Sequence, residues 1–169
     1  DYRVICFHSR LISTDRAVIE RELTELVGKK STCEKRDKLI VVGTQVLEQS
    51  LDIDFDYMIT ELCPMDLLLQ RSGRLHRHNR TRPDKLSEPE LCVLIPEDFS
   101  KSVYSGWILK QTEKYLPDKL VIPGCIPELV GAVYSEPDND EQQTAEYRKY
   151  SDEQKEKKQI AKKYCIPSQ

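Results

Sequence analysis

A short apolar run in the first third of the chain constrains the fold more than any other feature. Residues Lys38–Gly43 read KLIVVG, with no alternation of apolar and polar side chains. A run of this length and β-branched content is typical of a strand that is buried on both faces, as strands are in parallel sheets. We therefore expect a parallel sheet with helices on both sides.

The rest of the first hundred residues supports this expectation, because apolar runs alternate with segments of helical spacing. Further strands are expected at Arg3–His8, Phe55–Thr60 and Leu91–Ile95, and helices at Asp15–Val27 and Pro64–His78. Strands that alternate with helices need crossover connections and predict a three-layer α/β domain. Ligands bind such sheets at the carboxyl ends of the strands. Function is therefore expected in the segments that begin at His8, Gly43 and Glu61.

Beyond residue 100 the character of the chain changes from strands to helices. Helices are expected at Ser100–Leu116 and Pro127–Tyr134, joined by a connector that carries prolines. Asp138–Tyr164 reads as one long, highly charged helix with few apolar positions. Such a helix is expected to lie on a neighbouring surface, with its charges paired there and not bound to DNA.

Charge is unevenly distributed along the chain. The net charge is −3, which by itself argues against a nucleic-acid-binding domain. One stretch, residues 70–85, nevertheless carries six basic side chains against a single acidic one: Arg71, Arg74, Arg77, Arg80, Arg82 and Lys85 against Asp84. A cluster of this kind needs either an anionic partner or a solvated surface.

Several classes of protein find no support in the sequence. No apolar stretch approaches eighteen residues and no charged-then-apolar leader opens the chain, so we expect a cytoplasmic location and no membrane insertion. The six cysteines form no CxxC or CxxH pair. We therefore expect free thiols and no metal site.

The strongest chemical signal is the segment QRSGRLHRH at Gln70–His78. On a helix, Gln70, Arg74 and Arg77 follow the i, i+4, i+7 spacing and lie on one face. Two guanidinium groups and an amide on one face could clamp a polyphosphate, because arginine offers a planar set of donors to phosphate oxygens. The alternative is a solvated basic helix, which does not account for Gly73 or for the regular spacing.

Two further segments follow expected strands. Gly43 and Thr44 can present backbone N–H groups and a hydroxyl to phosphate, and Asp52 can accept hydrogen bonds from a ribose or hold an arginine. The alternative is a plain strand-to-loop turn with solvated acidic residues. Ser9 and Arg10 follow the first strand, and Arg10 has no evident structural task.

In order and spacing, these three segments resemble motifs IV, V and VI of superfamily 2 helicases. HSR…DR fits motif IV, VGTQVLEQSLDIDFD fits motif V, and QRSGRLHRH fits motif VI. The segments GRLHRH and TQVLEQSLDIDFD are similar to the corresponding motifs of the CRISPR-associated helicase-nuclease of type I systems. The resemblance implies a second RecA-like helicase domain over residues 1–100 and a helical extension or linker over residues 101–169. It also implies a sheet that is incomplete at its N-terminal end, because the opening strand and helix of that domain are not in the sequence.

The resemblance further implies a nucleotide site shared between two motor domains. Gln70 would approach the γ-phosphate, and Arg74 and Arg77 would act as arginine fingers that stabilise charge on the transferring phosphoryl group. The remaining contacts to the nucleotide would come from Asp52, Gly43 and Arg71.

On the DNA side, the resemblance implies that single-stranded DNA is held through its phosphate backbone. The residues that would contact it are Arg10, Ser9, Thr44 and Gln45. Gln45, together with Glu48 and Gln49, would couple the DNA site to the ATP site.

The implied cofactor is ATP with Mg²⁺, and the implied partners are the first RecA-like domain, an HD nuclease domain and a type I CRISPR surveillance complex. The sequence contains no GxxxxGK[ST] loop, no DExH motif and no histidine–aspartate metal cluster. We therefore expect a piece of a larger or split enzyme that is inactive alone. Two alternatives stay open: the equivalent domain of another superfamily 2 RNA or DNA helicase, and a non-catalytic module that docks nucleic acid or a protein inhibitor.

Overall fold

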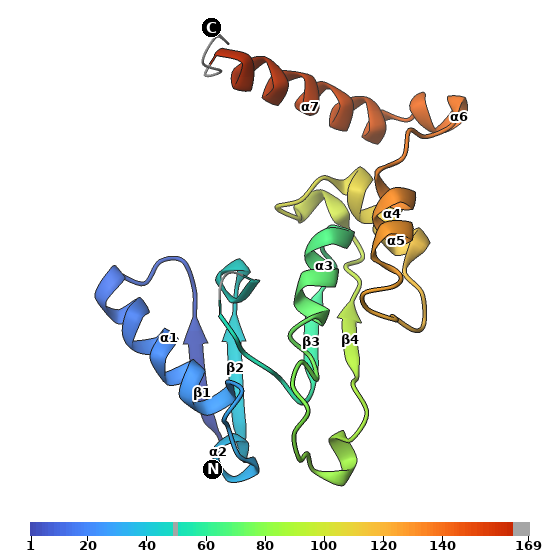
Figure 1. Ribbon diagram of the computed structural model, residues 1–169. Helices are drawn as coiled ribbons and strands as arrows, with labels where there is room; N and C mark the ends of the chain where they lie inside the picture. The colour runs from blue at the N-terminus through green and yellow to red at the C-terminus, as the bar shows by residue number, and fades with distance from the viewer. Residues whose placement is uncertain (49–50, 164–169) are drawn as a thin grey trace, which may run out of the picture. The chain divides into compact units, whose positions relative to one another are not determined.

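A computed structural model describes residues 1–48 and 51–163, and they form two compact units (Figure 1). The first unit comprises Asp1–Glu61 and Asp66–Leu94, and the second comprises Leu62–Met65 and the chain from Ile95 onward. Two residues with sequence-based predictions lie outside the described residues: Gln49, with a coupling role, and Tyr164, as the end of a helix.

The first unit is of the α/β class, as expected. In chain order it contains β1 (Arg3–Phe7), α1 (Ser13–Val27), α2 (Cys33–Arg36), β2 (Leu39–Gly43), the 3-10 helix η1 (Gln45–Glu48), β3 (Met58–Glu61), α3 (Met65–Ser72, whose first residue belongs to the second unit), the 3-10 helix η2 (Asp84–Leu86) and β4 (Leu91–Leu94).

The strands of this unit are joined in two parallel pairs. β1 pairs with β2 in a register that runs from Arg3↔Leu39 to Phe7↔Gly43. β3 pairs with β4, and this register ends at Glu61↔Leu94. The predicted parallel pairing is therefore confirmed. Because Phe7 and Gly43 are register partners, the segments that follow β1 and β2 leave the sheet at the same edge.

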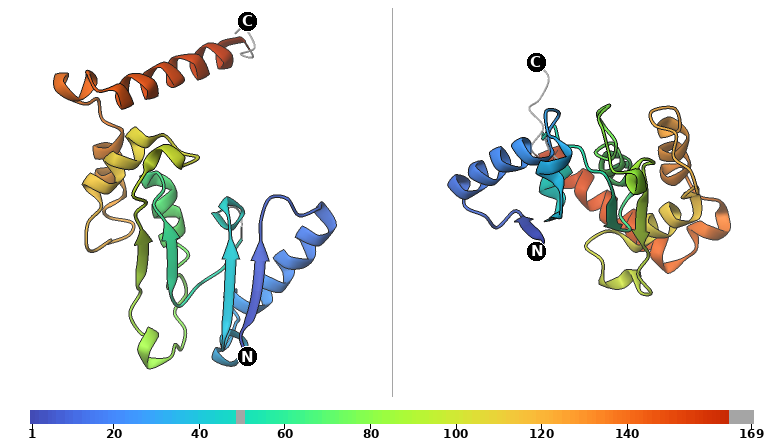
Figure 2. Two further views of the ribbon diagram at one scale, coloured as in Figure 1. Left: turned by 180° about the vertical axis from the view of Figure 1, so that it is seen from behind. Right: turned by 90° about the horizontal axis from the view of Figure 1, so that it is seen from below.

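One face of the β1–β2 pair is covered by α1, which runs alongside it in both views of Figure 2. Ile5 and Phe7 of β1 pack with Leu23 and Val27 of α1 in a buried cluster, and Leu23 and Phe7 are fully buried. These apolar positions occur at helical spacing in α1, which explains why the segment folds as a helix against the strands.

The opposite face of this pair is exposed. Val4, Ile40 and Val42 are 56%, 44% and 54% exposed, and Cys6 beside them is exposed as well. The expectation that the Lys38–Gly43 strand is buried on both faces is therefore wrong for the described chain. The reason is that α1 covers one face only, and no element in the described ranges covers the other.

Helix α3 ends earlier than predicted. The expected helix ran to His78, but α3 ends at Ser72, so Arg74 and Arg77 do not share a helical face with Gln70. Two features account for this end. The backbone beyond Gly73 turns to exchange hydrogen bonds with Phe55, through Phe55 N–H to Arg74 O (2.8 Å) and His76 N–H to Phe55 O (3.1 Å). His76 also adopts a left-handed conformation with φ of 48°, which no helix can continue.

The second unit is helical. Its elements are the 3-10 helix η3 (Phe99–Lys101), α4 (Gly106–Tyr115), α5 (Ile126–Tyr134), α6 (Asn139–Gln142) and α7 (Ala145–Lys163). The single helix expected over Asp138–Tyr164 is therefore wrong. It is interrupted because the Thr144 hydroxyl accepts a hydrogen bond from Tyr147 N–H at 3.3 Å and so begins a new helix at Ala145.

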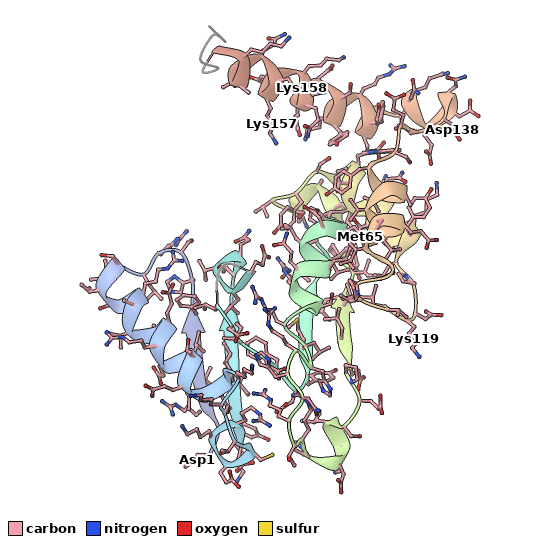
Figure 3. The ribbon with its side chains drawn as sticks, in the orientation of Figure 1. Asp1, Met65, Lys119, Asp138, Lys157 and Lys158 are labelled. Atoms are coloured by element: carbon pink, nitrogen blue, oxygen red, sulfur yellow. The ribbon has the colours of Figure 1, made fainter. Side chains whose placement is uncertain are left out.

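The beginning of α7 packs on α4. The rings of Tyr147 and Trp107 meet edge to face with centroids 5.1 Å apart, and Lys110 bonds Glu146 at 2.6 Å. The far half of α7 is exposed, and Lys157 and Lys158 project from it in Figure 3. At the start of α3, Met65 is fully buried (Figure 3).

No helix in the described part of the chain is long and apolar enough to cross a membrane. The five cysteines within that part form no disulfide with one another.

Candidate nucleotide and nucleic-acid site

The loop after β2 is the first element of the site. Thr44 N–H donates to Phe7 O at 3.2 Å, which continues the β1–β2 ladder by one bond before η1 begins. A Cβ atom at position 43 would lie 2.1 Å from Leu47 Cδ1 and 3.2 Å from Phe7 O, so any larger residue there would require the Leu47 side chain to move. Gly43 therefore has a packing role in addition to any ligand role. Thr44 and Gln45 are exposed next to it.

Arg71 ties this loop to the end of α3. Its guanidinium donates to Glu48 Oε1 at 2.7 Å and to Thr60 Oγ1 at 2.7 Å. The side chains of Arg71 and Glu48 are 20% and 8% exposed, so the ion pair is shielded from solvent. The loop after β2 and the end of α3 are thus joined by a charged pair, while the coupling role of Glu48 stays a prediction.

Arg74 makes the second connection between these segments. Its guanidinium donates to Leu51 O at 2.6 Å and to Glu48 O at 3.2 Å. Desolvation and the neighbouring charge of Arg77 lower the pKa of Arg74 from its ordinary value, although the side chain stays charged at any working pH. In this structure Arg74 therefore holds the backbone of the loop that follows η1.

Arg77 lies closer to solvent. Its Nε donates to Asp52 Oδ1 at 2.9 Å, and His78 Nε2 lies 3.0 Å from the same oxygen. The side chains of Arg77 and Asp52 are 43% and 53% exposed. Partial burial raises the pKa of Asp52, but the charge of His78 and the hydrogen bond from Arg77 outweigh it and lower the pKa overall. Arg77 is thus free to exchange Asp52 for another anion.

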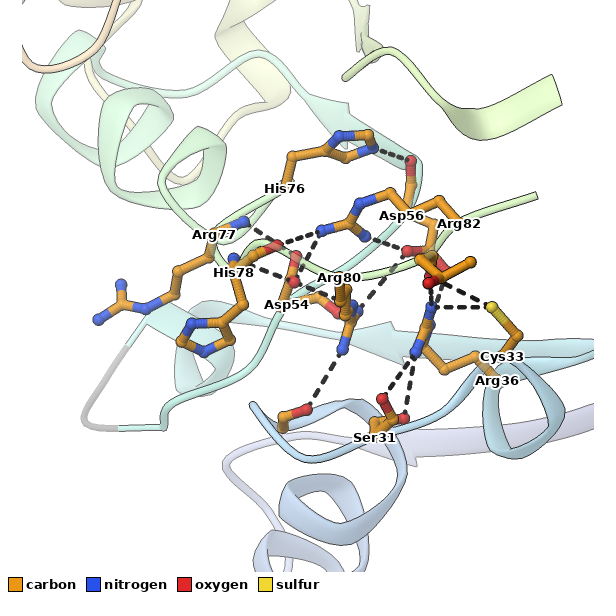
Figure 4. A network of polar contacts seen from close by, with 12 residues as sticks. Ser31, Cys33, Arg36, Asp54, Asp56, His76, Arg77, His78, Arg80 and Arg82 are labelled. Carbon is orange, nitrogen blue, oxygen red and sulfur yellow. Dashed lines mark hydrogen bonds and ion pairs between the residues drawn. The ribbon is translucent and has the colours of Figure 1, made fainter. Parts of the chain in front are cut away.

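A buried network lies beneath Arg77 and His78 (Figure 4). Its centre is Asp54, which is fully buried and lies within hydrogen-bond or ion-pair distance of Arg80 and Arg82. Asp56 accepts from Arg36 Nε at 2.8 Å and pairs with Arg82 as well. Burial raises the pKa of Asp56, but hydrogen bonds and charges from Arg36 and Arg82 lower it overall.

Sequence reasoning missed this network, although the sequence carries a signal for it. Asp52, Asp54 and Asp56 alternate with apolar residues at a period of two, and basic side chains occupy every even position from His76 to Arg82, separated there by polar residues. A period of two places side chains on one face of an extended segment. Two such segments with opposite charges predict a pairing, and the Phe55↔Leu75 bridge shows that they run side by side.

The other residues predicted to contact DNA or the nucleotide, Ser9, Arg10 and Gln70, lie on the surface. Ser9 and Arg10 are exposed in the turn after β1, at the same sheet edge as Thr44, and Arg10 N–H donates to His8 Nδ1 at 3.2 Å. Gln70 is exposed near the end of α3. Within residues 1–48 and 51–163, no group of three or more histidine, cysteine or acidic side chains is arranged to hold a metal ion.

Comparison with known proteins places these features in a family context. Residues 1–80 match the family model of CRISPR-associated nuclease/helicase Cas3, C-terminal. A CRISPR-associated nuclease/helicase Cas3 from Streptococcus thermophilus is 45% identical over 80% of the chain, and a CRISPR-associated endonuclease/helicase Cas3 from Thermus thermophilus is 41% identical over 78%. The chain spans about 15% of the length of either relative.

Solved structures give the same result for the fold. Crystal structures of T. fusca Cas3, alone and with ATP, superpose on 98% of the chain with TM-scores of 0.84 and 0.83, at 32% identity. Each match covers 20% of the T. fusca chain. A chain of a CRISPR RNA-guided surveillance complex, pre-nicking, matches with a TM-score of 0.78 at 32% identity, over 98% of this chain and 22% of that one.

Proposed function

Residues 1–80 belong to the family of C-terminal regions of the CRISPR-associated nuclease/helicase Cas3, and from this premise we propose that the chain is the second motor domain of an ATP-dependent translocase of single-stranded DNA. The translocase would feed target DNA to a nuclease in type I CRISPR interference. In this proposal the first motor domain and the nuclease domain are provided by other parts of the protein, and the present chain does not hydrolyse ATP without them.

The observation that carries the proposal is the connection between motifs V and VI. Arg71 and Arg74 bind the loop after β2 through Glu48 and Leu51, while Arg77 pairs with Asp52 through a side chain that is 43% exposed. A motor needs this combination, because a change at the nucleotide must move the segment that holds DNA. A solvated basic surface needs none of these contacts.

On the nucleotide side, the chain contributes cations and no phosphate-binding loop. Arg77 would leave Asp52 and stabilise the charge that develops on the transferring phosphoryl group, an effect that is typically worth about 10³–10⁵ in rate. Arg74 would assist as a second finger, and Gln70 would approach the γ-phosphate. Asp52, Gly43 and Arg71 complete the proposed set of residues near the nucleotide.

ATP would supply the free energy for movement, with Mg²⁺ held by the first motor domain. Solved structures of T. fusca Cas3 with ATP, AMPPNP and ADP support the choice of nucleotide.

On the DNA side, the exposed residues at the carboxyl edge of β1 and β2 are the proposed contacts. Arg10 would pair with a phosphate, and Ser9, Thr44 and Gln45 would donate hydrogen bonds to the backbone. Such contacts read no base sequence and depend on salt. Association with a type I surveillance complex is proposed on the likeness to a chain of such a complex.

The test is to supply the first motor domain in trans and to measure DNA-stimulated ATP turnover. We expect turnover to be restored by the wild-type chain and to fall by a factor of about 10³ or more with Arg77→Ala, while DNA binding persists. Lys119→Ala removes an exposed side chain of the second unit that belongs to neither proposed set of contact residues; it is the control and should leave turnover unchanged. Equal turnover in wild type and Arg77→Ala would refute the finger role and favour a docking module.

A further inference from the structure

We propose that Asp54 is a positioning residue for Arg77: its buried carboxylate fixes the backbone from which the finger projects. The inference depends on the proposed function, because Arg77 must be the group that acts on ATP. Asp54 itself is fully buried, so it acts only through its neighbours.

The first argument is the direct contact to the finger's backbone. Asp54 Oδ1 accepts a hydrogen bond from Arg77 N–H at 2.9 Å, and Oδ2 accepts one from His78 N–H at 3.1 Å. Both oxygens of one carboxylate are therefore used on two consecutive peptide groups (Figure 4). Because α3 ends at Ser72, no helical hydrogen bonds hold this backbone in place.

The second argument is that Asp54 is itself immobilised. Its N–H donates to Val27 O at 2.9 Å, at the end of α1, and Arg80 bonds both its carbonyl oxygen and Gly28 O. The carboxylate thus belongs to a frame that ends on α1. A rigid frame of this kind transmits the position of the core to the Arg77 backbone.

The third argument is the charge of the group. Arg80 Nε lies 3.0 Å and Arg82 Nη2 2.8 Å from Asp54 Oδ2, and the two side chains are only 7% and 6% exposed. An ionised carboxylate accepts at both oxygens, whereas an amide accepts at one and would turn its NH₂ group toward a donor. Asparagine has the same shape, but it cannot accept hydrogen bonds from both peptide groups and it lacks the charge that pairs with the two arginines.

Asp56 provides a matched control. It pairs with Arg82 and Arg36 in the same network but accepts no hydrogen bond from the backbone of Arg77 or His78. Asp56→Asn therefore removes a carboxylate of the network and leaves the finger's backbone attached. If Asp54 acts only as one charge of the network, the two substitutions should change the rate of ATP hydrolysis by similar factors.

The experiment measures single-turnover ATP hydrolysis and ATP affinity in the complete helicase-nuclease that carries these residues. A misplacement of a catalytic group by 1 Å costs about 10²-fold in rate, so we expect Asp54→Asn to lower the rate about 100-fold with less than threefold change in ATP affinity. Asp56→Asn should stay within threefold of wild type. In an Arg77→Ala background, Asp54→Asn should have less than a threefold further effect, because the finger it positions is gone.

Three results separate the possible failures. A rate within threefold of wild type for Asp54→Asn, in a protein that Arg77→Ala inactivates, overturns the inference and leaves the proposed function intact. A full 100-fold loss in the Arg77→Ala background also overturns it, because Asp54 would then act by another route. Full activity of Arg77→Ala overturns the proposed function itself. If Asp54→Asn does not fold, Asp54→Glu keeps the charge and displaces the carboxylate, and it should show the same loss and the same dependence on Arg77.

Discussion

Two arginines of motif VI, Arg74 and Arg77, should differ sharply in what they contribute to stability. Arg74→Ala removes two hydrogen bonds from a guanidinium to the carbonyls of Leu51 and Glu48, at 2.6 and 3.2 Å. Hydrogen bonds that involve a charged group contribute roughly 1.5–3 kcal/mol each, and the site is partly solvated. We therefore expect the free energy of unfolding to fall by about 2–4 kcal/mol. Arg77→Ala removes an exposed ion pair with Asp52, and such pairs contribute about 0–1 kcal/mol.

The assay is urea unfolding of the chain, followed by far-ultraviolet circular dichroism. With a slope of about 2 kcal/mol per molar urea, Arg74→Ala should lower the midpoint by about 1–2 M, and Arg77→Ala by about 0.5 M at most. The 3-10 helix η1, which ends at Glu48, should also exchange its amide hydrogens faster in Arg74→Ala but not in Arg77→Ala. Equal midpoints for the two variants would refute the assignment of Arg74 to the loop backbone. A larger loss for Arg77→Ala would show that its ion pair with Asp52 is not the weak, exposed contact described above.

Three further predictions concern acid stability, the core and DNA binding. The folded-state pKa of Asp56 lies below its unfolded value of about 3.9, so the stabilisation from this carboxylate is complete above that value and is lost as the pH falls through the folded-state pKa. The difference in unfolding free energy between wild type and Asp56→Asn should therefore be constant from about pH 5 to 8 and shrink below about pH 4. A constant difference down to about pH 2 would contradict this. Leu23→Ala should cost about 2–5 kcal/mol in thermal or urea unfolding, because Leu23 is fully buried between α1 and the strands, and a loss under 1 kcal/mol would contradict that packing. In the assembled protein, Arg10→Ala should weaken single-stranded DNA binding equally for all sequences, as measured by fluorescence anisotropy. It should also reduce the slope of log affinity against log salt by about 0.7, and a sequence-dependent loss would argue against a phosphate contact.

The regular elements of the first unit could be predicted because their signals are local. The β-branched run at Lys38–Gly43 and the helical spacing in Asp15–Val27 correspond to β2 and α1 to within two residues at each end. The parallel pairing followed from the alternation of strands and helices. The run at Lys38–Gly43 could not indicate that one face of β2 is exposed in this chain. An apolar pattern shows that a strand favours burial, but it does not show which elements pack against the strand.

The geometry of motif VI could not be predicted, because it depends on residues far away in the sequence. Helical spacing placed Gln70, Arg74 and Arg77 on one face, but the backbone after Ser72 pairs with Phe55 instead. This tertiary pairing overrides the local helical preference. As a result Arg74 and Arg77 have different partners and different exposure, which the even spacing of the arginines concealed. The split of residues 1–100 from 101–169 stays a prediction.

The buried ion-pair network has a consequence for the rate at which the chain unfolds. It joins segments that are distant in sequence: Arg36, Asp54 and Asp56, and Arg80 and Arg82. Contacts of this kind can form only after the strands have been brought together, so they are expected to be absent from the folding transition state. Interactions that form late have little influence on the folding rate and slow unfolding instead. The network should therefore slow unfolding and lengthen the lifetime of the folded first unit.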